Sequence, residues 1–503
     1  MKRNRLYWPI LLLVVIFIFG CKTPPQAIEE VGPYSPETPQ SENEVLESSG
    51  LTRGRTGYIL YDPNTRRTLT QVNSQKLFLP GSTLKILSVA AGLKVLGPDF
   101  RFKTTLSTAG KVVGDKIEGD LYLTGGGDPF LNLANLMGMV QSLKSLGVKK
   151  LTGRFFYDDS LFPEQKRIDL KRDSQASFNP GVSALSSEFN RTSLRWKPHP
   201  LSGKAIQAYT IPPTSGLEFR TSVKSDSNTD WFTENTSERS VWSIPAKANH
   251  EGSQNLPLSN PGISTAQLFQ YLARMEGLDL PSPLQKSAPA HSKILVTHLS
   301  ETLLSLSERI LEFSNNLMAE LVLVATANRL GHKKELEPGL VLANSAERVS
   351  EYLKKQIPET SWEGFKWKTG SGLGGENQIT PAQLLGVLEW AEKLHLGGPR
   401  FSSLLPISGW KGISKRLAEP TAALQVWAKT GTLHFAHGIA GVLYPRSGKK
   451  LLFVILNADA KQREQAEAFD SVLPPALEQS SKTFIKRTDQ YQDRLLTRWI
   501  QDY

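Results

Sequence analysis

The alternation of apolar and polar positions predicts a hairpin and then a buried helix. Residues 56–61 and 66–71 flank a strong turn signal at 62–64, which favours a β-hairpin. Apolar side chains lie on nearly all sides of the segment 84–96, as expected of a helix inside a core. A glycine and a proline at 97–98 end that helix.

The middle of the chain has a different pattern of apolar and polar residues. From residue 103 to 259, short β-like segments are separated by Gly, Pro, Ser and Asn, and one helical segment at 131–147 interrupts them. We predict that residues 103–259 form a large β-rich domain inserted into a main domain. The flanking segments, 50–102 and 260–480, would then make up that main domain.

The second flanking segment mixes helices with strands. Helical patterns dominate at 265–330, and another helix is expected to begin at 380–381, with proline in its first turn. Three apolar segments, 422–427, 437–444 and 451–456, are joined by short links. They favour adjacent antiparallel strands in one buried sheet, so the predicted fold class is α/β, an antiparallel sheet flanked by helices.

The N-terminus predicts export. Three basic residues precede an uncharged run that ends at Gly20 and is short for a permanent membrane helix, so residues 1–20 are interpreted as a signal peptide. An uncleaved anchor is the alternative. The chain's single cysteine, Cys21, follows directly, which excludes an internal disulfide.

The residues around this cysteine resemble the lipobox of bacterial lipoproteins, although Phe19 is bulky where a small residue is usual. We expect Cys21 to be lipidated, with ordinary secretion as the alternative. Lys22 is not the aspartate that would favour the inner membrane, so the periplasmic face of the outer membrane is expected. Residues 21–49 hold five prolines and few large apolar groups, which predicts a flexible tether.

Length and net charge limit the classes of partner that this protein can be expected to bind. A chain of 503 residues predicts two or three domains, and a net charge of +11 suits an anionic envelope polymer or a membrane. No basic segment is interleaved with aromatic residues, so nucleic-acid binding is not expected. The C-terminal tail, 481–503, mixes charged with apolar residues and is interpreted as a docked surface helix without an assigned function.

Candidate chemistry begins at Ser82 and Lys85, which lie one helical turn apart on one face. A serine hydroxyl becomes a good nucleophile only when a base removes its proton, and a neighbouring amine can be that base. Ser408 and Lys411 have the same spacing, but they lie in a turn-like segment and not at the start of a buried helix.

Two more motifs follow in order. Ser314-Asn315-Asn316 falls between helical segments, and Lys429-Thr430-Gly431-Thr432 ends a predicted strand. Together with Ser-x-x-Lys they match the motif set of β-lactamases and penicillin-binding proteins. Residues 253–255 and 368–370 are decoys, and the second leads into a helix and not into a hairpin.

With these motifs the chain resembles the D-alanyl-D-alanine carboxypeptidase/endopeptidase family. These are the class C low-molecular-mass penicillin-binding proteins of the penicillin-binding protein 4 type. The likeness covers about residues 57–477 and includes Leu79-Pro80-Gly81-Ser82, Gly126-Gly127-Asp128-Pro129 and the long insert. It implies a serine β-lactamase/DD-peptidase-like fold and penicillin-sensitive hydrolysis of D-alanyl bonds in peptidoglycan stems through an acyl-enzyme. β-Lactam antibiotics would be covalent inhibitors, and no metal or organic cofactor is required.

The resemblance also implies roles for single residues. Ser82 would form the acyl-enzyme and Lys85 would accept its proton, which requires an amine that is neutral near pH 7. Burial and a second cation, for which Lys429 is the candidate, must therefore depress the pKa of Lys85. Ser314 and Asn316 would relay the proton to the leaving amine and hold the substrate's amide.

The third motif would bind the substrate. Thr430, Gly431 and Thr432 would hold the terminal carboxylate with Lys429, and the backbone N–H groups of Ser82 and Thr432 would form the oxyanion hole. By the same resemblance, an acidic residue of the insert meets the substrate's free amino group. Asp158 is the candidate for that residue, and a solvated turn carboxylate is the alternative.

Three points stay open. Thr369 stands where the family usually has an aspartate before Gly-Ser-Gly-Leu, and His434 could line the cleft, although a zinc site with His437 is not expected. A β-lactamase is a rival hypothesis, but no Glu-x-x-Leu-Asn segment is present. A non-catalytic cell-wall-binding lipoprotein is the alternative from another class.

Overall fold

The computed structural model describes residues 41–171, 176–198, 206–213, 217–221, 232–235, 240–244, 251–331, 337, 339–413, 416–417, 422–469 and 473–503. The expected signal peptide, Cys21 and the first part of the expected tether lie outside these residues. Within them, no helix combines the length and the apolar character needed to cross a membrane.

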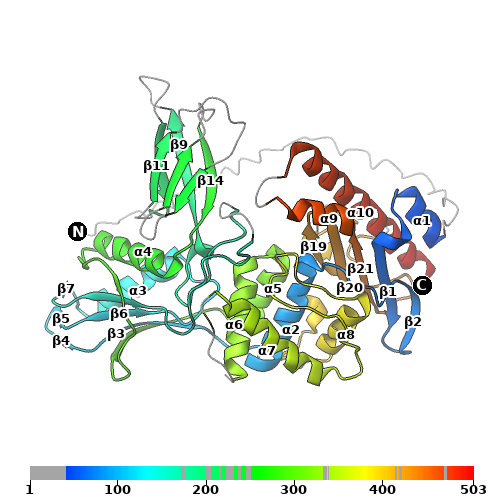
Figure 1. Cartoon of the computed structure of the whole chain (residues 1–503). Coiled ribbons are helices and arrows are strands. Elements are labelled where there is room, and N and C mark those ends of the chain that lie inside the picture. Colours follow the sequence, from blue (N-terminus) through cyan, green and yellow to red (C-terminus); the bar gives the residue numbers. More distant parts are fainter. Residues whose placement is uncertain are drawn as a thin grey trace, which may run out of the picture. The chain divides into compact units, whose positions relative to one another are not determined.

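The main domain is built on a seven-stranded sheet in the order β18-β17-β19-β20-β21-β1-β2 (Figure 1). The strands are β1 (Thr56–Asp62), β2 (Arg67–Val72), β17 (Ile407–Ser408), β18 (Gly412–Ile413), β19 (Val426–Leu433), β20 (Ala436–Leu443) and β21 (Leu451–Ala458). The predicted hairpin and the three predicted C-terminal strands are antiparallel neighbours here. The first of those three strands begins at Val426 and not near residue 422.

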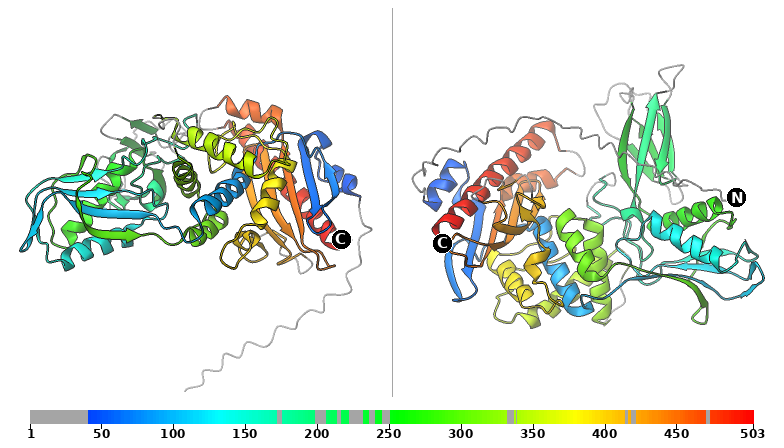
Figure 2. Two further views of the ribbon diagram at one scale, coloured as in Figure 1. Left: turned by 90° about the horizontal axis from the view of Figure 1, so that it is seen from below. Right: turned by 180° about the vertical axis from the view of Figure 1, so that it is seen from behind.

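Helices cover both faces of this sheet (Figures 1 and 2). The helices of the main domain are α1 (Glu42–Ser48), α2 (Lys85–Leu96), α5 (Leu303–Phe313), α6 (Asn316–Arg329), α7 (Val341–Gln356), α8 (Pro381–Glu392), α9 (Ala460–Glu467) and α10 (Pro475–Asp502). Ile59 packs with the cluster around α2 and α8, whereas Tyr58 and Leu60 pack with α10. This alternation is what a strand buried on both faces requires.

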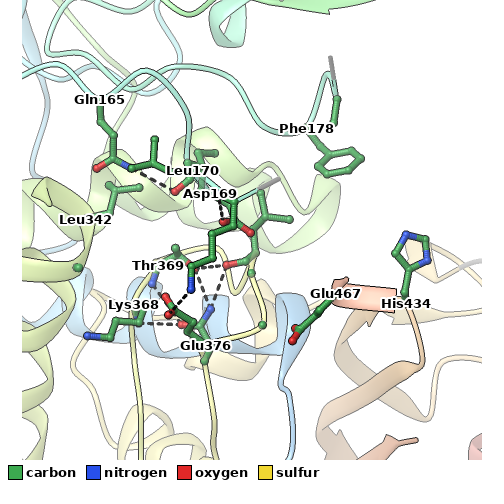
Figure 3. Close-up of a pocket in the computed structure, with 18 of the residues that line it drawn as sticks. Gln165, Asp169, Leu170, Phe178, Leu342, Lys368, Thr369, Glu376, His434 and Glu467 are labelled. Carbon is green, nitrogen blue, oxygen red and sulfur yellow. Dashed lines mark hydrogen bonds and ion pairs between the residues drawn. The ribbon is translucent and has the colours of Figure 1, made fainter. Parts of the chain in front are cut away.

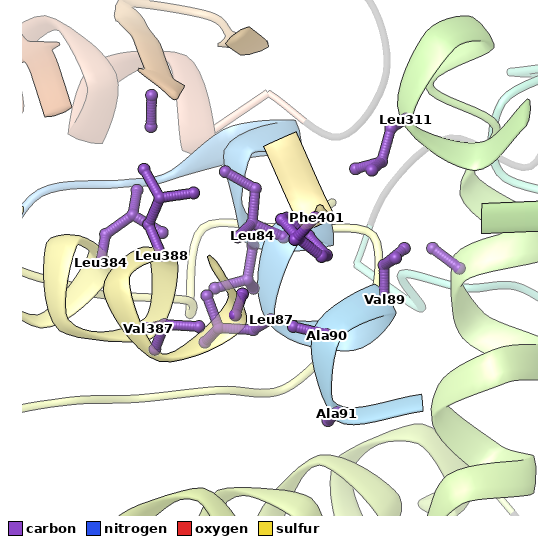
Figure 4. Close-up of a cluster of buried hydrophobic side chains, with 14 of the residues drawn as sticks. Leu84, Leu87, Val89, Ala90, Ala91, Leu311, Leu384, Val387, Leu388 and Phe401 are labelled. Atoms are coloured by element: carbon purple, nitrogen blue, oxygen red, sulfur yellow. The ribbon is translucent and has the colours of Figure 1, made fainter. Parts of the chain in front are cut away.

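Helix α2 is the centre of the larger core, as its all-round apolar pattern predicts. Leu87 of α2 and Leu84, which directly precedes the helix, pack with the α8 side chains of the same buried cluster (Figure 4). On another side, a β-carbon at Gly92 would lie 2.6 Å from Val322 of α6, so only glycine permits this close approach of the two helices. The rigid packing fixes the position of the helix that carries the candidate chemistry.

The insert is β-rich, as predicted, and its described residues form four sheets. Its largest sheet has the order β15-β8-β6-β3-β16, with β3 (Lys103–Thr108), β6 (Leu121–Thr124), β8 (Phe155–Asp158), β15 (Leu284–Gln285) and β16 (Lys293–Leu299). The smaller sheets are β4-β5-β7 (Lys111–Val113, Lys116–Glu118, Lys150–Leu151), β10-β9-β14 (Ile206–Ile211, Arg191–Pro198, Gly252–Pro257) and β11-β13-β12 (Leu217–Thr221, Ser240–Ile244, Phe232–Asn235).

The expected boundary of the insert at residue 259 is wrong. Helix α4 (Pro261–Met275) buries Phe269 and Leu272 together with α3 (Leu133–Ser145) and the largest insert sheet. Strand β16 then pairs with β3 in that same sheet. The insert therefore ends near Leu299. Both α4 and β16, which the sequence analysis placed in the main domain, belong to the insert.

Two further boundaries need correction. The expected tether extends to residue 49, but Glu42–Ser48 form α1, which has a capping box at Ser41 and buries Val45 and Leu46. The C-terminal tail does form the docked helix that the sequence suggested, yet α10 begins at Pro475 and is part of the core. Trp499 is completely buried against the sheet and α1.

Candidate active site

Ser82 lies in a short 3-10 helix (Gly81–Leu84) that leads directly into α2. Lys85 is the first residue of α2, and its Nζ lies 2.8 Å from Oγ of Ser82. The structure thus brings together the two residues that the Ser-x-x-Lys spacing places on one face. The Lys85 side chain is wholly buried.

Two fixed acceptors complete the surroundings of this amine. Nζ of Lys85 lies 2.8 Å from Oδ1 of Asn316 and 2.9 Å from the carbonyl oxygen of Ser371. A neutral amine has two N–H donors and one lone pair. It can donate to both oxygens and still accept the hydroxyl proton of Ser82, so the geometry suits a lysine that acts as a base.

The electrostatic surroundings also favour the neutral form of the Lys85 amine. Burial, and then the positive charge of Lys429, hold the pKa of Lys85 well below its ordinary value, while Glu320 acts in the opposite direction. Lys429 lies in β19 and is itself almost fully buried, with Nζ donating to the carbonyl oxygen of Thr430 at 2.9 Å. Burial lowers the pKa of Lys429 to about 7.

Strand β19 runs directly against the Ser82 turn because both lack side chains at the contact. A β-carbon at Gly431 would lie 2.7 Å from the backbone nitrogen of Ser82. Gly81 has a φ of +51°, and a β-carbon there would lie 3.0 Å from the backbone nitrogen of Thr432. The contact therefore brings together the two segments whose backbone nitrogens are expected in the oxyanion hole.

The other residues predicted for the site, Thr430, Thr432 and Ser314, differ in their exposure and in their contacts. Thr432 is exposed in the cleft, with Oγ1 3.4 Å from Nδ1 of His437, and Thr430 is half-buried. Ser314 ends α5 with a left-handed φ of 54°, just before the residues that begin α6. Among the described residues its side chain has no hydrogen-bond partner, so its relay role stays a prediction.

Glu320 is a functional candidate that the sequence analysis missed. It lies one helical turn after Asn316 in α6, is completely buried, and accepts hydrogen bonds from the backbone nitrogens of Gly370 (2.6 Å) and Ser371 (2.8 Å). Burial raises its pKa, against these hydrogen bonds and the charge of Lys85. The available signal was a single carboxylate in an otherwise apolar helical segment.

Glu320 holds the turn that supports Lys85. The carbonyl of Gly370 accepts a hydrogen bond from Ser88 of α2, and the carbonyl of Ser371 accepts one from Lys85. At Thr369, where the family resemblance expects an aspartate, Oγ1 donates to the carbonyl of Leu373 instead. The decoy Lys-Thr-Gly segment is thus a supporting turn next to the site and not the catalytic motif.

Asp158 does not face the cleft. It ends β8 in the insert, is 7% exposed, and accepts hydrogen bonds from Ser160 and from the backbone nitrogen of Ala288. Its assignment as a substrate-binding residue is therefore wrong, because the local turn and the β15 connection occupy its carboxylate. The alternative of a solvated turn carboxylate is wrong too, because the group is buried.

Two adjacent cavities surround the site. The first, of about 610 Å³, is lined by Ser82, Phe178, Asn316, Gly372, Leu373, Thr432, Leu433, His434 and five residues of α10. The second, of about 730 Å³, shares Phe178, Leu373 and His434 with the first and includes Asp169, Lys171 and Glu376 (Figure 3). Within the described residues, no group of three or more potential ligands is placed to hold a metal ion.

A serine paired with a buried lysine at the start of a core helix, beside an antiparallel sheet, defines a serine hydrolase that acts by acyl transfer. The chain belongs to the D-Ala-D-Ala carboxypeptidase 3 (S13) family, whose model matches residues 40–474. Membership makes it a serine-type DD-peptidase and confirms the family expected from the motifs.

Individual relatives agree with this assignment. The chain is 25% identical to the D-alanyl-D-alanine carboxypeptidase DacB of Haemophilus influenzae over 421 residues, 79% of this chain and 84% of that protein. It is 24% identical to the D-alanyl-D-alanine carboxypeptidase of Actinomadura sp. over 447 residues, 82% and 79% of the two chains. The crystal structure of penicillin binding protein 4 from Haemophilus influenzae has the same fold, with a TM-score of 0.75, 23% identity and coverage of 92% and 100%.

Proposed function

We propose that this protein cleaves D-alanyl peptide bonds of peptidoglycan stems through an acyl-enzyme on Ser82. The observation that carries the proposal is the 2.8 Å approach of the buried Lys85 amine to the Ser82 hydroxyl. In the first step, Lys85 accepts the hydroxyl proton as Oγ bonds to the D-alanyl carbonyl carbon. The carbonyl electrons move to the oxygen, which the N–H groups of Ser82 and Thr432 stabilise by about 3 kcal/mol each.

Collapse of this intermediate breaks the C–N bond. The proton then passes from Lys85 to the leaving amine, with Ser314 as the relay, while Asn316 holds the substrate's amide. Lys429 and the hydroxyls of Thr430 and Thr432 hold the terminal carboxylate, and Gly431 leaves room for the strand against the turn. Water hydrolyses the ester in the reverse sequence of proton transfers and regenerates the serine.

β-Lactam antibiotics acylate Ser82 in this account. A Haemophilus influenzae penicillin binding protein 4 has been crystallised in complex with a β-lactam, and it shares this fold at 22% identity and a TM-score of 0.70. Fluorescent penicillin should label the purified protein, and Ser82→Ala should remove the label. Unlabelled wild-type protein would favour the non-catalytic cell-wall-binding alternative, and rapid nitrocefin turnover would favour a β-lactamase.

The balance between carboxypeptidase and endopeptidase action is tested with purified muropeptides. Loss of crosslinked dimers indicates endopeptidase action, and shortening of pentapeptides to tetrapeptides indicates carboxypeptidase action. For the substrate's free amino group, Asp169 replaces Asp158 as the candidate partner, because Asp169 lines the cavity that adjoins the Ser82 cleft. Asp169→Asn should weaken cleavage of stems with a free side-chain amine more than of acetylated stems.

The protein works in the periplasm, anchored to the outer membrane through a lipid on Cys21. Support comes from the apolar N-terminal run, the lipobox-like residues and Lys22. Expression of the full chain in a Gram-negative host with labelled palmitate provides the test. The wild type should carry the label and sediment with outer membranes, and Cys21→Ala should lose the label; an unlabelled wild type would contradict lipidation.

A further inference from the structure

Helix α10 lies at the far end of the sequence (Figure 1), yet five of its residues line one wall of the Ser82 cleft. One face of α10 is buried on the sheet through Phe484, Tyr491, Leu495 and Trp499. The adjacent face contributes Ser481, Lys482, Ile485, Lys486 and Asp489 to the cleft. His434, from the β19–β20 turn, approaches Ser481 with Nδ1 3.4 Å from Oγ, which links this wall to the strand that carries the third motif.

This wall presents positive charge to the cleft. Lys486 is exposed, and no acidic side chain of the described residues lies within ion-pair distance of it. In the described part of the chain, Lys482 forms an ion pair with Glu478, at 2.5 Å, in which the two side chains are 66% and 45% exposed. A pair so open to solvent contributes little energy, so Lys482 can exchange Glu478 for a substrate anion at little cost.

Asp489 is the carboxylate in this wall, and it forms an ion pair with Arg416. Asp489 lies 3.0 Å from Nη1 of Arg416 and 3.2 Å from Nε2 of His437, both of which come from the sheet side of the helix. Arg416 is shared with Asp493, which lies 2.6 Å from its Nη2, and burial lowers the pKa of His437 to about 3, so the charge of Asp489 is offset only in part. Lys482 and Lys486 are the exposed charged side chains of this wall.

The size of the cleft shows that it receives more than the scissile dipeptide. A volume of about 610 Å³ is typical of sites that enclose a drug-sized ligand, and two alanine residues fill only a fraction of it. The cleft therefore has room for further residues of the substrate, and α10 forms one side of that room. Peptidoglycan stems carry carboxylates on these residues, and an ammonium group recognises a carboxylate as a charge-assisted hydrogen-bond partner.

We infer that Lys482 and Lys486 form a subsite for a carboxylate of the stem peptide that lies outside the D-alanyl pair. This inference rests on the proposed function, since it names the substrate feature that the same cleft selects. The enzyme then prefers stems with a free carboxylate over stems in which that group is an amide. The preference weakens as salt is added, because the lysines are solvent-exposed.

The test compares two synthetic pentapeptides that end in D-Ala-D-Ala and differ only in the α-carboxylate or α-amide of their γ-linked D-glutamyl residue. The wild type should have a kcat/KM about tenfold higher for the carboxylate, the effect of one charge-assisted hydrogen bond. Lys482→Ala combined with Lys486→Ala should bring the ratio close to one. Arg487→Ala is the matched control, since Arg487 lies next to Gly50 and does not line the cleft, and it should keep the wild-type ratio.

Each variant is first shown to take up fluorescent penicillin on Ser82, which separates a lost subsite from a lost acylation centre. A wild type that is labelled but cleaves both peptides equally would overturn the subsite and leave the proposed function intact. A double variant whose kcat/KM falls by the same factor for both peptides would also overturn the subsite. An unlabelled wild type would overturn the proposed function itself.

Discussion

Nζ of Lys85 and Oγ of Ser82 lie 2.8 Å apart at the start of one helix, and the lysine side chain has no contact with solvent. A charged amine is costly in such a place, so the fold itself favours the neutral base that the chemistry needs. The same packing that stabilises the core therefore prepares the nucleophile.

Replacing Lys85 should abolish acylation. With Lys85→Ala the rate of penicillin acylation should fall at least ~100-fold, the contribution expected of a general base. Lys85→Arg should not restore it, because a guanidinium stays protonated and cannot accept the serine proton. The second-order rate of labelling measures both, and a fast arginine variant would contradict the role of Lys85.

The charge of Glu320 should set the pH at which acylation begins. Glu320 raises the pKa of Lys85, so Glu320→Gln should lower that pKa further. Acylation requires neutral Lys85 and rises with pH through this pKa, so the acidic limb of the profile should move to lower pH. Leu323→Ala in the same helix is the control for a packing defect, and it should leave the limb in place.

Lys429 should act in the opposite direction. Its positive charge lowers the pKa of Lys85, so in Lys429→Ala the pKa of Lys85 should rise and the acidic limb should move to higher pH. Because the pKa of Lys429 is about 7, the shift in the pKa of Lys85 should arise below that pH, where the wild-type Lys429 is charged. The variant also loses a carboxylate-binding group, so its labelling should be slower at every pH, and the positions of the acidic limbs are compared after each profile is scaled to its own plateau. Stopped-flow labelling across the pH range provides the measurement, and limbs of Glu320→Gln and Lys429→Ala that shift the same way would refute the account.

Gly431 should tolerate no side chain. In Gly431→Ala the new β-carbon would lie 2.7 Å from the backbone nitrogen of Ser82, so the strand or the turn must move. Penicillin labelling should be lost or strongly reduced. Gly138→Ala is the control, since no atom lies within 4 Å of that position and alanine should stabilise helix α3 by about 0.5–1 kcal/mol.

Helix α10 should be essential for stability. Trp499 is completely buried, makes an edge contact with Tyr58 at a centroid distance of 5.7 Å, and donates its indole N–H to Glu42. Trp499→Ala should lower the free energy of unfolding by about 3–5 kcal/mol, measured by urea denaturation. Arg494→Ala on the same helix should change it little, and equal losses in the two variants would show that burial is not the cause.

Short sequence motifs predicted which polar side chains the fold brings together. The Ser-x-x-Lys spacing fixes Ser82 and Lys85 on one face of a helix, and the third motif lies in a strand because β19 and β20 are apolar and closely linked. Residues that act through the turn at 369–373 escaped prediction. Glu320 carries no motif, and its role becomes visible only when folding places two backbone N–H groups against it.

Boundaries and side-chain direction were the weaker part of the prediction. The insert extends to β16 because β16 pairs with a strand nearly two hundred residues earlier, and no local pattern reports such a pairing. Asp158 and Asp169 are equally polar in sequence. Only the fold shows that the first is buried at the end of β8 and that the second lines a cavity.

Ser82 should be the residue that β-lactams acylate. Benzylpenicillin should add the mass of one penicilloyl group to the purified protein, and peptide mapping should place that group on the hydroxyl of Ser82. Ser82→Ala should gain no mass while it keeps the wild-type unfolding midpoint. A penicilloyl group on any other residue, or equal acylation of Ser82→Ala, would contradict the account.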